Sequence, residues 1–83
     1  MSRVGRLPIP IPSGVQVTLD GQHARVQGPK GTLEHDVHTA ISVALEDDTI
    51  VVSRPSNSPS HRALHGLTRA LLANMVTGVS TGF

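Results

Sequence analysis

The 83-residue sequence contains no cysteine, tryptophan or tyrosine, and its single phenylalanine is the last residue, Phe83. Without cysteine, neither disulfides nor thiolate metal sites can supplement the core, which is consistent with a reducing compartment such as the cytoplasm. Without an interior phenylalanine, tyrosine or tryptophan, stacking of such rings on nucleic-acid bases is excluded, so we expect any RNA contact to use backbone and shape. A cysteine nucleophile is also excluded, and no serine lies in a glycine elbow, so nothing here supports catalysis.

Long hydrophobic runs are absent as well. No apolar segment approaches the roughly 20 residues needed to cross a bilayer, and the start, MSRVGRLPIPIP, lacks the apolar centre of a secretion signal. We therefore expect a soluble, cytoplasmic chain with no membrane partner. A chain this short buries only about 60% of the surface that its unfolded form exposes, so one domain with a small core is expected.

The net positive charge is small, at a formal +1, whereas nucleic-acid-binding domains are usually conspicuously basic. The charged residues are unevenly distributed along the sequence. Residues 1–30 carry four bases and one acid (+3), residues 31–53 carry five acids and no base (−5), and residues 54–83 carry three arginines (+3). The two ends are therefore basic and the middle acidic, and an anionic partner should meet the ends.

Alternation of apolar and polar residues predicts five short strands, in the sequences VQVTLD, HARVQ, TLEHDVH, ISVALE and TIVVSR. Turns are expected at Asp20-Gly21, at the GPKG sequence of residues 28–31, and at Asp47-Asp48. Before these strands, three prolines alternate with isoleucines, so residues 1–12 should form an extended arm.

From Ser58 the period changes to that of a helix. Ser58 can cap it, Pro59 fits its first position, and the end should fall near Thr77 or Ser80. Apolar residues at helical spacing are Leu64, Leu67, Leu71, Met75 and Val79. The predicted class is α+β, with a small antiparallel-rich sheet of about five strands packed with one amphipathic helix around a single core in residues 13–83.

One face of the predicted helix is a candidate docking surface. On a helical wheel the apolar stripe centres on Leu64, Leu71 and Met75, and Arg62 and Arg69 stand together on the opposite side. The small residues beside these arginines are Gly66, Ala70, Ala73 and Thr77. A phosphate backbone or a second protein could approach this close-packing face while the guanidiniums reach it. An ordinary solvated helix face has the same pattern, and the wheel leaves both interpretations open.

Two further patterns have structural alternatives. His61 and His65 have the four-residue spacing of zinc ligands on a helix, but the glutamate of HExxH and a third ligand are missing, so no metal or other cofactor is predicted. GPKG is similar to the GXXG clamp of KH domains, which however joins two helices, and it lacks the GK[ST] of a Walker motif. A tight turn with a glycine at each end explains it better, with Lys30 presented for a possible phosphate contact.

Three separated segments carry a resemblance to a known family. They are MSRVGRLPIPIPSGVQVTLDG, then GPKGTL, then HRALHGLTRALLANMVTGVSTGF. In this order they closely resemble the start of the bacterial sixth large-subunit ribosomal protein family, and the match covers essentially the whole chain. The resemblance implies a non-enzymatic protein of the cytoplasmic ribosome whose fold is repeated twice along the full length, of which this chain is the first copy and lacks the second.

The resemblance also implies partners. It implies that the chain supports large-subunit ribosomal RNA near the stalk base, the factor-binding region and the sarcin–ricin loop. The other implied partners are neighbouring ribosomal proteins, and no small-molecule substrate is implied. The contact residues carried over are Ser2, Arg3, Arg6, Lys30, Arg62, His65 and Arg69. With so little excess charge, this piece alone should bind RNA weakly and in a salt-sensitive way.

Two other functions stay open at this point. The chain could be a protein-docking module that packs its small-residue helix face on a neighbouring ribosomal protein or on its own missing half. It could also be a zinc hydrolase that uses His61 and His65, in which case metal should co-purify with it at near one equivalent.

Overall fold

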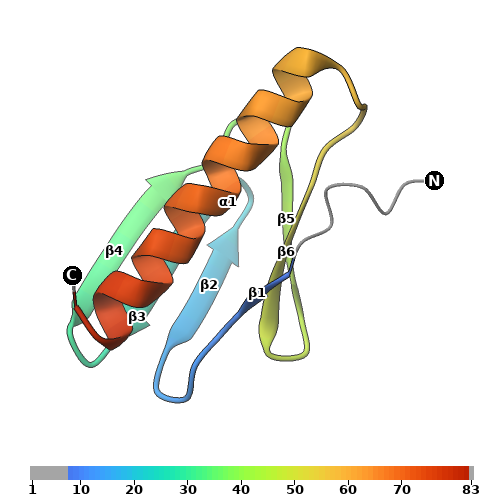
Figure 1. Ribbon diagram of the computed structural model, residues 1–83. Helices are drawn as coiled ribbons and strands as arrows, with labels where there is room; N and C mark the ends of the chain where they lie inside the picture. Colours follow the sequence, from blue (N-terminus) through green and yellow to red (C-terminus); the bar gives the residue numbers. More distant parts are fainter. Residues whose placement is uncertain (1–7, 83) are drawn as a thin grey trace.

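The computed structural model describes residues 8–82 and contains six strands followed by one helix (Figure 1). The elements are β1 (Ile9–Pro10), β2 (Gln16–Asp20), β3 (His23–Gly28), β4 (Gly31–Asp36), β5 (Ser42–Glu46), β6 (Thr49–Ser53) and α1 (Pro59–Ser80). The α+β class is confirmed. The sequence predicted one sheet of about five strands. The structure has two antiparallel sheets of three strands each, in the orders β1-β6-β5 and β2-β3-β4.

The sixth strand comes from the end of the predicted arm. Ile9 pairs with Ile50 and Pro10 with Thr49, and the Ile11 amide donates to the Asp48 carbonyl at 2.9 Å. Proline is tolerated there because β1 is an edge strand, where a missing N–H interrupts no ladder. Ile9 is buried in the core, so this part of the proline-rich segment is held by both pairing and packing.

The predicted hairpins form, but the turn between β2 and β3 lies one residue later than predicted. Asp20 pairs with His23, so Gly21 and Gln22 occupy the turn, and Gly21 has a φ of +62°. Glycine at the first turn position is what a type II′ turn requires, whereas the expected type I′ turn would have centred on Asp20 and Gly21. The β5–β6 turn contains Asp47 and Asp48 as predicted, and Asp47 has a φ of +54°.

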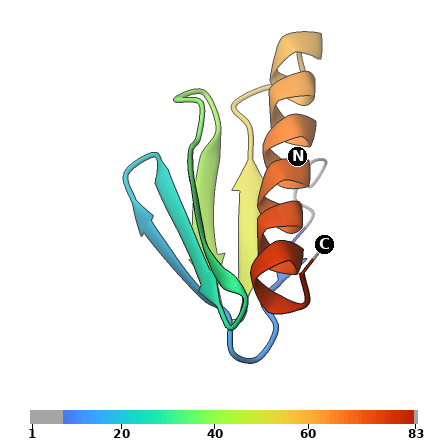
Figure 2. The same ribbon diagram turned by 90° about the vertical axis from the view of Figure 1, so that its left-hand side faces the viewer.

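Helix α1 covers one side of the strands (Figures 1 and 2). Its main contacts are with β3, β4 and β6, so it bridges the two sheets. Between these layers lies one hydrophobic cluster, to which both sheets and the helix contribute. Its members are Ile9, Val15, Ala24, Val26, Val37, Ile41, Ile50, Val52, Leu72, Met75, Val76 and Val79. The single core predicted from the sequence is confirmed.

Both ends of α1 are stabilised by specific hydrogen bonds. At the start, the Ser58 hydroxyl accepts from the His61 amide at 3.3 Å, and Pro59 occupies the first turn, as predicted. At the end, the Thr81 amide donates to the Thr77 carbonyl at 2.9 Å, and the Lys30 amide donates to the Val79 carbonyl at 2.8 Å. The GPKG turn therefore closes the last turn of the helix.

The buried stripe of α1 differs from the prediction. Its buried residues are His65, Thr68, Leu72, Met75, Val76 and Val79, while Leu64 and Leu71 are only half-buried and Leu67 is 58% exposed. At 3.6 residues per turn, this stripe is rotated by about 70° around the axis from the one centred on Leu64, Leu71 and Met75. One histidine and one threonine thus take inward positions that the wheel had assigned to leucines.

Candidate nucleic-acid interface

Arg62 and Arg69 lie on one flank of α1, at the border of its buried stripe. Arg62 is exposed, and its side chain makes no hydrogen bond or ion pair with any residue between 8 and 82. Arg69 is half-buried, and its Nη2 donates to the backbone carbonyl of Pro8 at 3.4 Å. The flank that carries both guanidiniums therefore adjoins Pro8, the residue before β1.

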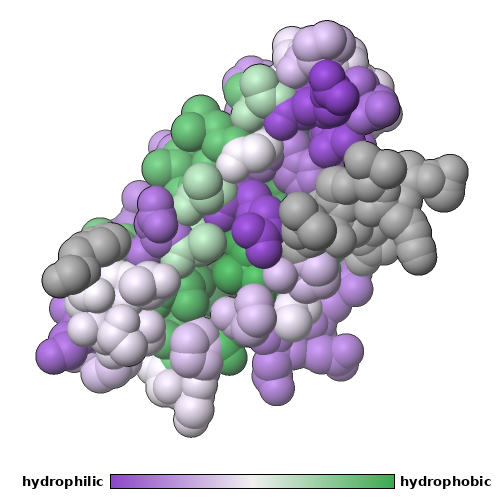
Figure 3. All heavy atoms as spheres, viewed as in Figure 1, coloured by the Kyte–Doolittle hydropathy of each residue, from purple (hydrophilic) through white to green (hydrophobic). Residues whose placement is uncertain are grey.

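Charge is segregated between the helix and the strands. Helix α1 contains two arginines and no carboxylate, and its first turn holds no acidic residue. All six acids lie on strands or in their turns, at Asp20, Glu34, Asp36, Glu46, Asp47 and Asp48. An anion that approaches α1 therefore meets no carboxylate on the helix itself. Figure 3 shows hydrophilic surface around the N-terminal end of α1 and apolar surface along one of its flanks.

Lys30 lies far from these arginines. It occupies the β3–β4 turn, which is anchored at the carbonyl of Val79. Arg62 and Val79 are seventeen positions apart on the helix, or about 25 Å at 1.5 Å per residue. The structure therefore brings Arg62 and Arg69 together and leaves Lys30 as a separate cation. Ser2, Arg3 and Arg6 lie outside the described residues.

The structure argues against His65 as a contact residue. Its exposed fraction is 3%, because it belongs to the buried stripe of α1. Its Nδ1 lies 2.7 Å from Nη1 of Arg54, and burial together with this guanidinium lowers the pKa of His65 below its usual value. A neutral imidazole enclosed in this way cannot reach an external phosphate, so we exclude His65 from the surface.

Most of the close-packing face lies on the surface of α1. Gly66, Ala70 and Thr77 are exposed and Ala73 is half-buried. A Cβ added at Gly66 would meet nothing within 4 Å, so this face is open on the outer side of the helix. Leu67 lies beside it with more than half of its surface exposed. The face carries no charge of its own and is bordered by the two arginines on one side.

Neither a metal centre nor a membrane span is found in the part of the chain that the structure describes. His61 Nδ1 lies 2.5 Å from the Ser56 hydroxyl and His65 is paired with Arg54, so the two imidazoles have separate partners. No group of three metal-ligating side chains occurs between residues 8 and 82. Within the same range, α1 is not apolar enough to cross a bilayer.

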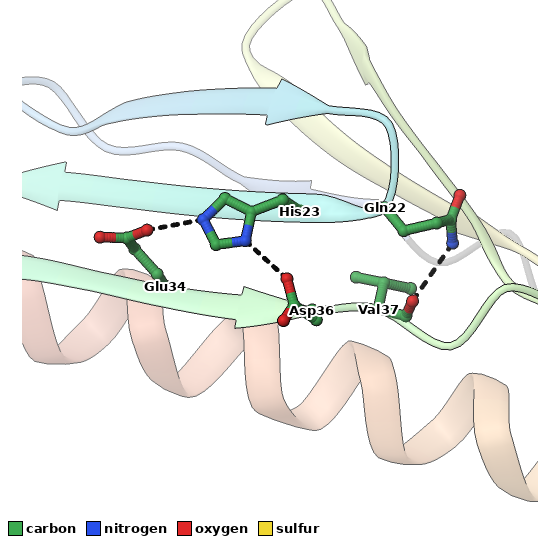
Figure 4. A network of polar contacts seen from close by, with 5 residues as sticks. All are labelled: Gln22, His23, Glu34, Asp36 and Val37. Carbon is green, nitrogen blue, oxygen red and sulfur yellow. Dashed lines mark hydrogen bonds and ion pairs between the residues drawn. The ribbon is translucent and has the colours of Figure 1, made fainter.

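A polar cluster on the outer face of β3 and β4 was not predicted (Figure 4). His23 lies between two carboxylates, with Nε2 at 2.6 Å from Glu34 and Nδ1 at 2.6 Å from Asp36. These contacts raise the pKa of His23, with the hydrogen bond to Asp36 as the largest cause and that to Glu34 next. Pairing the two predicted strands through the GPKG turn places His23 opposite Asp36, which is the sequence signal that could have revealed this cluster.

Comparison with known proteins identifies the family. The family model described as Ribosomal protein L6 matches residues 11–82. This chain belongs to the ribosomal protein L6 family. Curated relatives named large ribosomal subunit protein uL6 include those of Caldicellulosiruptor bescii, 55% identical, and Desulforamulus reducens, 54% identical, each over the whole chain and 46% of the relative. The relative from Acidothermus cellulolyticus is 56% identical over 84 residues, which is 47% of its length.

Membership of the L6 family confirms the resemblance drawn from the three sequence segments. The chain spans about half the length of the curated relatives it matches. The matched range of the L6 model contains the whole shared core except Ile9, together with Lys30 and both helix arginines. It begins after the arm residues Ser2, Arg3 and Arg6.

Proposed function

We propose that this chain is a structural constituent of the large ribosomal subunit that supports translation in the cytoplasm by binding large-subunit ribosomal RNA. It acts without catalysis, cofactor or small-molecule substrate. The family membership supports the ribosomal role, because the L6 relatives are named as large-subunit proteins. The observation that carries the RNA contact is the flank of α1, where Arg62 and Arg69 project from a helix without a carboxylate.

This basic surface adjoins Pro8, the first residue that the structure describes. The hydrogen bond between Arg69 and the Pro8 carbonyl places residue 8 beside the flank. Ser2, Arg3 and Arg6 precede Pro8 in the sequence. We therefore propose that Ser2, Arg3, Arg6, Arg62 and Arg69 contact one segment of RNA backbone and that Lys30 contacts another.

The position in the subunit rests on the resemblance alone. We propose that the chain lies near the stalk base and the factor-binding region, where it braces the RNA. Directed hydroxyl-radical cleavage from an iron chelate attached at Arg62→Cys in assembled subunits tests this position. Cuts clustered in the RNA of that region are expected, and cuts confined to a distant RNA domain would contradict the proposed position.

The RNA contact itself is tested by removing one charge from each side of the molecule. Arg62→Gln removes an exposed guanidinium from the flank of α1. Arg25→Gln removes an exposed guanidinium from β3, where the buried neighbours Ala24 and Val26 show by alternation that Arg25 faces away from the helix. The two variants have the same net charge.

Affinity for a large-subunit RNA fragment is measured as a function of salt concentration. Arg62→Gln should weaken binding and reduce the slope of log K against log salt by about 1, because one phosphate contact is lost. Arg25→Gln should leave both unchanged. Equal effects of the two substitutions would mean that only net charge matters, and the proposed surface would be rejected.

Protein docking is the alternative function, and the exposed, uncharged close-packing face favours it. Incorporation of full-length chains into large subunits separates the two. If Arg62→Glu with Arg69→Glu abolishes incorporation and Gly66→Leu does not, the RNA surface is supported. If Gly66→Leu abolishes it and the charge reversals do not, packing on a neighbouring ribosomal protein is the function of this face. The open space around Gly66 means that leucine fits the isolated fold.

A further inference from the structure

Arg54 organises the loop between β6 and α1. Its Nε donates to the Ser56 carbonyl at 3.0 Å, and its Nη2 donates to Oδ1 of Asn57 at 2.8 Å. The third contact leaves the loop, since Nη1 lies 2.7 Å from Nδ1 of His65 on the helix. One guanidinium thus holds two loop residues and joins them to α1.

The contact between Arg54 and His65 requires a neutral imidazole. A guanidinium has donors only, so Nδ1 of His65 must act as the acceptor. Protonation of His65 would place a hydrogen on Nδ1, and two donors that both carry positive charge would then face each other at 2.7 Å. The hydrogen bond cannot exist in that state.

The surroundings of His65 favour the neutral form. Burial lowers its pKa, as do the charges of Arg54 and, more weakly, Arg69, and only the backbone carbonyl of Val52 acts in the opposite direction. Strand β6, on which Val52 lies, contains no titratable side chain. On β3 and β4, side chains alternate between the two faces, so Arg25, Glu34 and Asp36 point away from the helix. His35 is the only titratable residue of these two strands on the face toward the helix.

We propose that Arg54 and His65 form a proton-sensitive latch that holds loop 54–58 against the start of α1. In the neutral state the latch keeps Ser58 at the N-cap, where its hydroxyl accepts from the His61 amide. When His65 takes up a proton, Arg54 loses its anchor on the helix, and the loop with the first turn of α1 becomes free to open. The hydrophobic cluster that contains Leu72 includes neither Arg54 nor His65.

The latch is tested by following the full chain by NMR from pH 8 to pH 5. Backbone signals of Ser56 and Asn57 and the Hε signal of Arg54 report on the loop, and the imidazole of His65 reports on protonation. The wild type should show loss of the Arg54 Hε signal with the same midpoint as His65. In His65→Asn, whose amide oxygen can accept near the position of Nδ1 but cannot titrate, the Arg54 Hε signal should be independent of pH.

His61→Asn is the matched control, because His61 is the other histidine that touches the loop, through Ser56. It should retain the wild-type pH response. A loop that opens at the same pH in His65→Asn, or a His65 titration without any change in the Arg54 signal, would overturn the latch. Should His65→Asn fail to fold, Arg54→Gln provides a second measurement. It should shift the His65 midpoint upward, and an unchanged midpoint would also reject the proposal.

Discussion

At the scale of single residues, the space around a Cα decides what a glycine does in this chain. Gly28 lies where the β3–β4 turn meets the end of α1, and a Cβ there would come within 2.5 Å of the Val79 carbonyl oxygen. Gly66 lies on the outer side of α1, where a Cβ would meet nothing within 4 Å. The first glycine permits a close approach of two backbones, whereas the second only lowers helix propensity.

The same substitution should therefore have opposite effects at these two positions. Gly28→Ala should destabilise the fold by about 1–3 kcal/mol, because the contacted atom is backbone and the helix end must move. Gly66→Ala should stabilise it by about 0.8–1 kcal/mol, the difference in helix propensity between the two residues. Urea unfolding followed by circular dichroism measures both. A neutral or stabilising Gly28→Ala would show that the turn does not pack on the helix as described.

His23 should make stability depend on pH in one direction. Two carboxylates at 2.6 Å leave no place for an unprotonated ring nitrogen, so the charged imidazole is favoured in the fold. The pKa of His23 is raised above 6.5, so its contribution is fully present below pH 6.5, while both carboxylates stay ionised, and is lost as pH rises through the raised pKa. An NMR titration should give a midpoint above 6.5 in the wild type.

The control for His23 removes its partners. Glu34→Gln combined with Asp36→Asn should return the His23 midpoint to about 6.5, the value of an unperturbed histidine, and should abolish this part of the pH dependence of unfolding. A raised midpoint that survives the double substitution would show that the two carboxylates are not its cause.

At the scale of elements, the sequence predicted where α1 begins and ends but not which way it faces. Ser58 and Pro59 are local signals, and their effect depends only on neighbouring backbone groups. The buried face depends on what lies opposite, and here His65 is accommodated because Arg54 satisfies its Nδ1. Giving most weight to the leucines therefore rotated the predicted stripe toward Leu64, Leu67 and Leu71.

The sheets show the same division. The β2–β3, β3–β4 and β5–β6 pairs are hairpins, and turn residues next to alternating segments were enough to predict them. The β1–β6 pair joins residues about forty positions apart and has no local signal. The candidate surface shows the same difference between local and tertiary features. Helix periodicity was enough to predict that Arg62 and Arg69 share one side of α1. The contact of Arg69 with Pro8 and the burial of His65 depend on tertiary packing, which the sequence pattern does not show.

Two leucines on α1 test its orientation directly. Leu72 is fully buried and Leu67 is 58% exposed. Leu72→Ala should cost about 2–5 kcal/mol, because it removes core contacts and leaves a cavity. Leu67→Ala should change the free energy of unfolding by no more than about 0.5 kcal/mol, as expected for a surface position. If Leu67→Ala is the more costly of the two in denaturant unfolding, the original wheel was right and the described rotation is wrong.

At the scale of the whole molecule, two sheets share one core and charge is divided between their outer faces and the helix. In the described residues 8–82, Val26 from one sheet and Val52 from the other belong to the same hydrophobic cluster as Leu72 of α1. With three strands and no helix of its own, each sheet would expose this apolar face to water. The helix that joins the sheets is also the element that presents Arg62 and Arg69, so the proposed RNA surface depends on the integrity of both.

This arrangement predicts a single cooperative unfolding transition. Urea unfolding is followed by NMR at two places, the imidazole of His23 on β3 and the backbone amide of Val51 on β6, which lie in different sheets. Because both sheets lose their apolar cover when α1 detaches, the two midpoints should coincide, and Val26→Ala and Val52→Ala should each shift both midpoints together. Leu67→Ala serves as a control that should move neither. If Val52→Ala shifts the unfolding midpoint of one sheet and leaves the midpoint of the other sheet unchanged, the two sheets unfold independently. Helix α1 would then cover only one sheet and would not bridge the two.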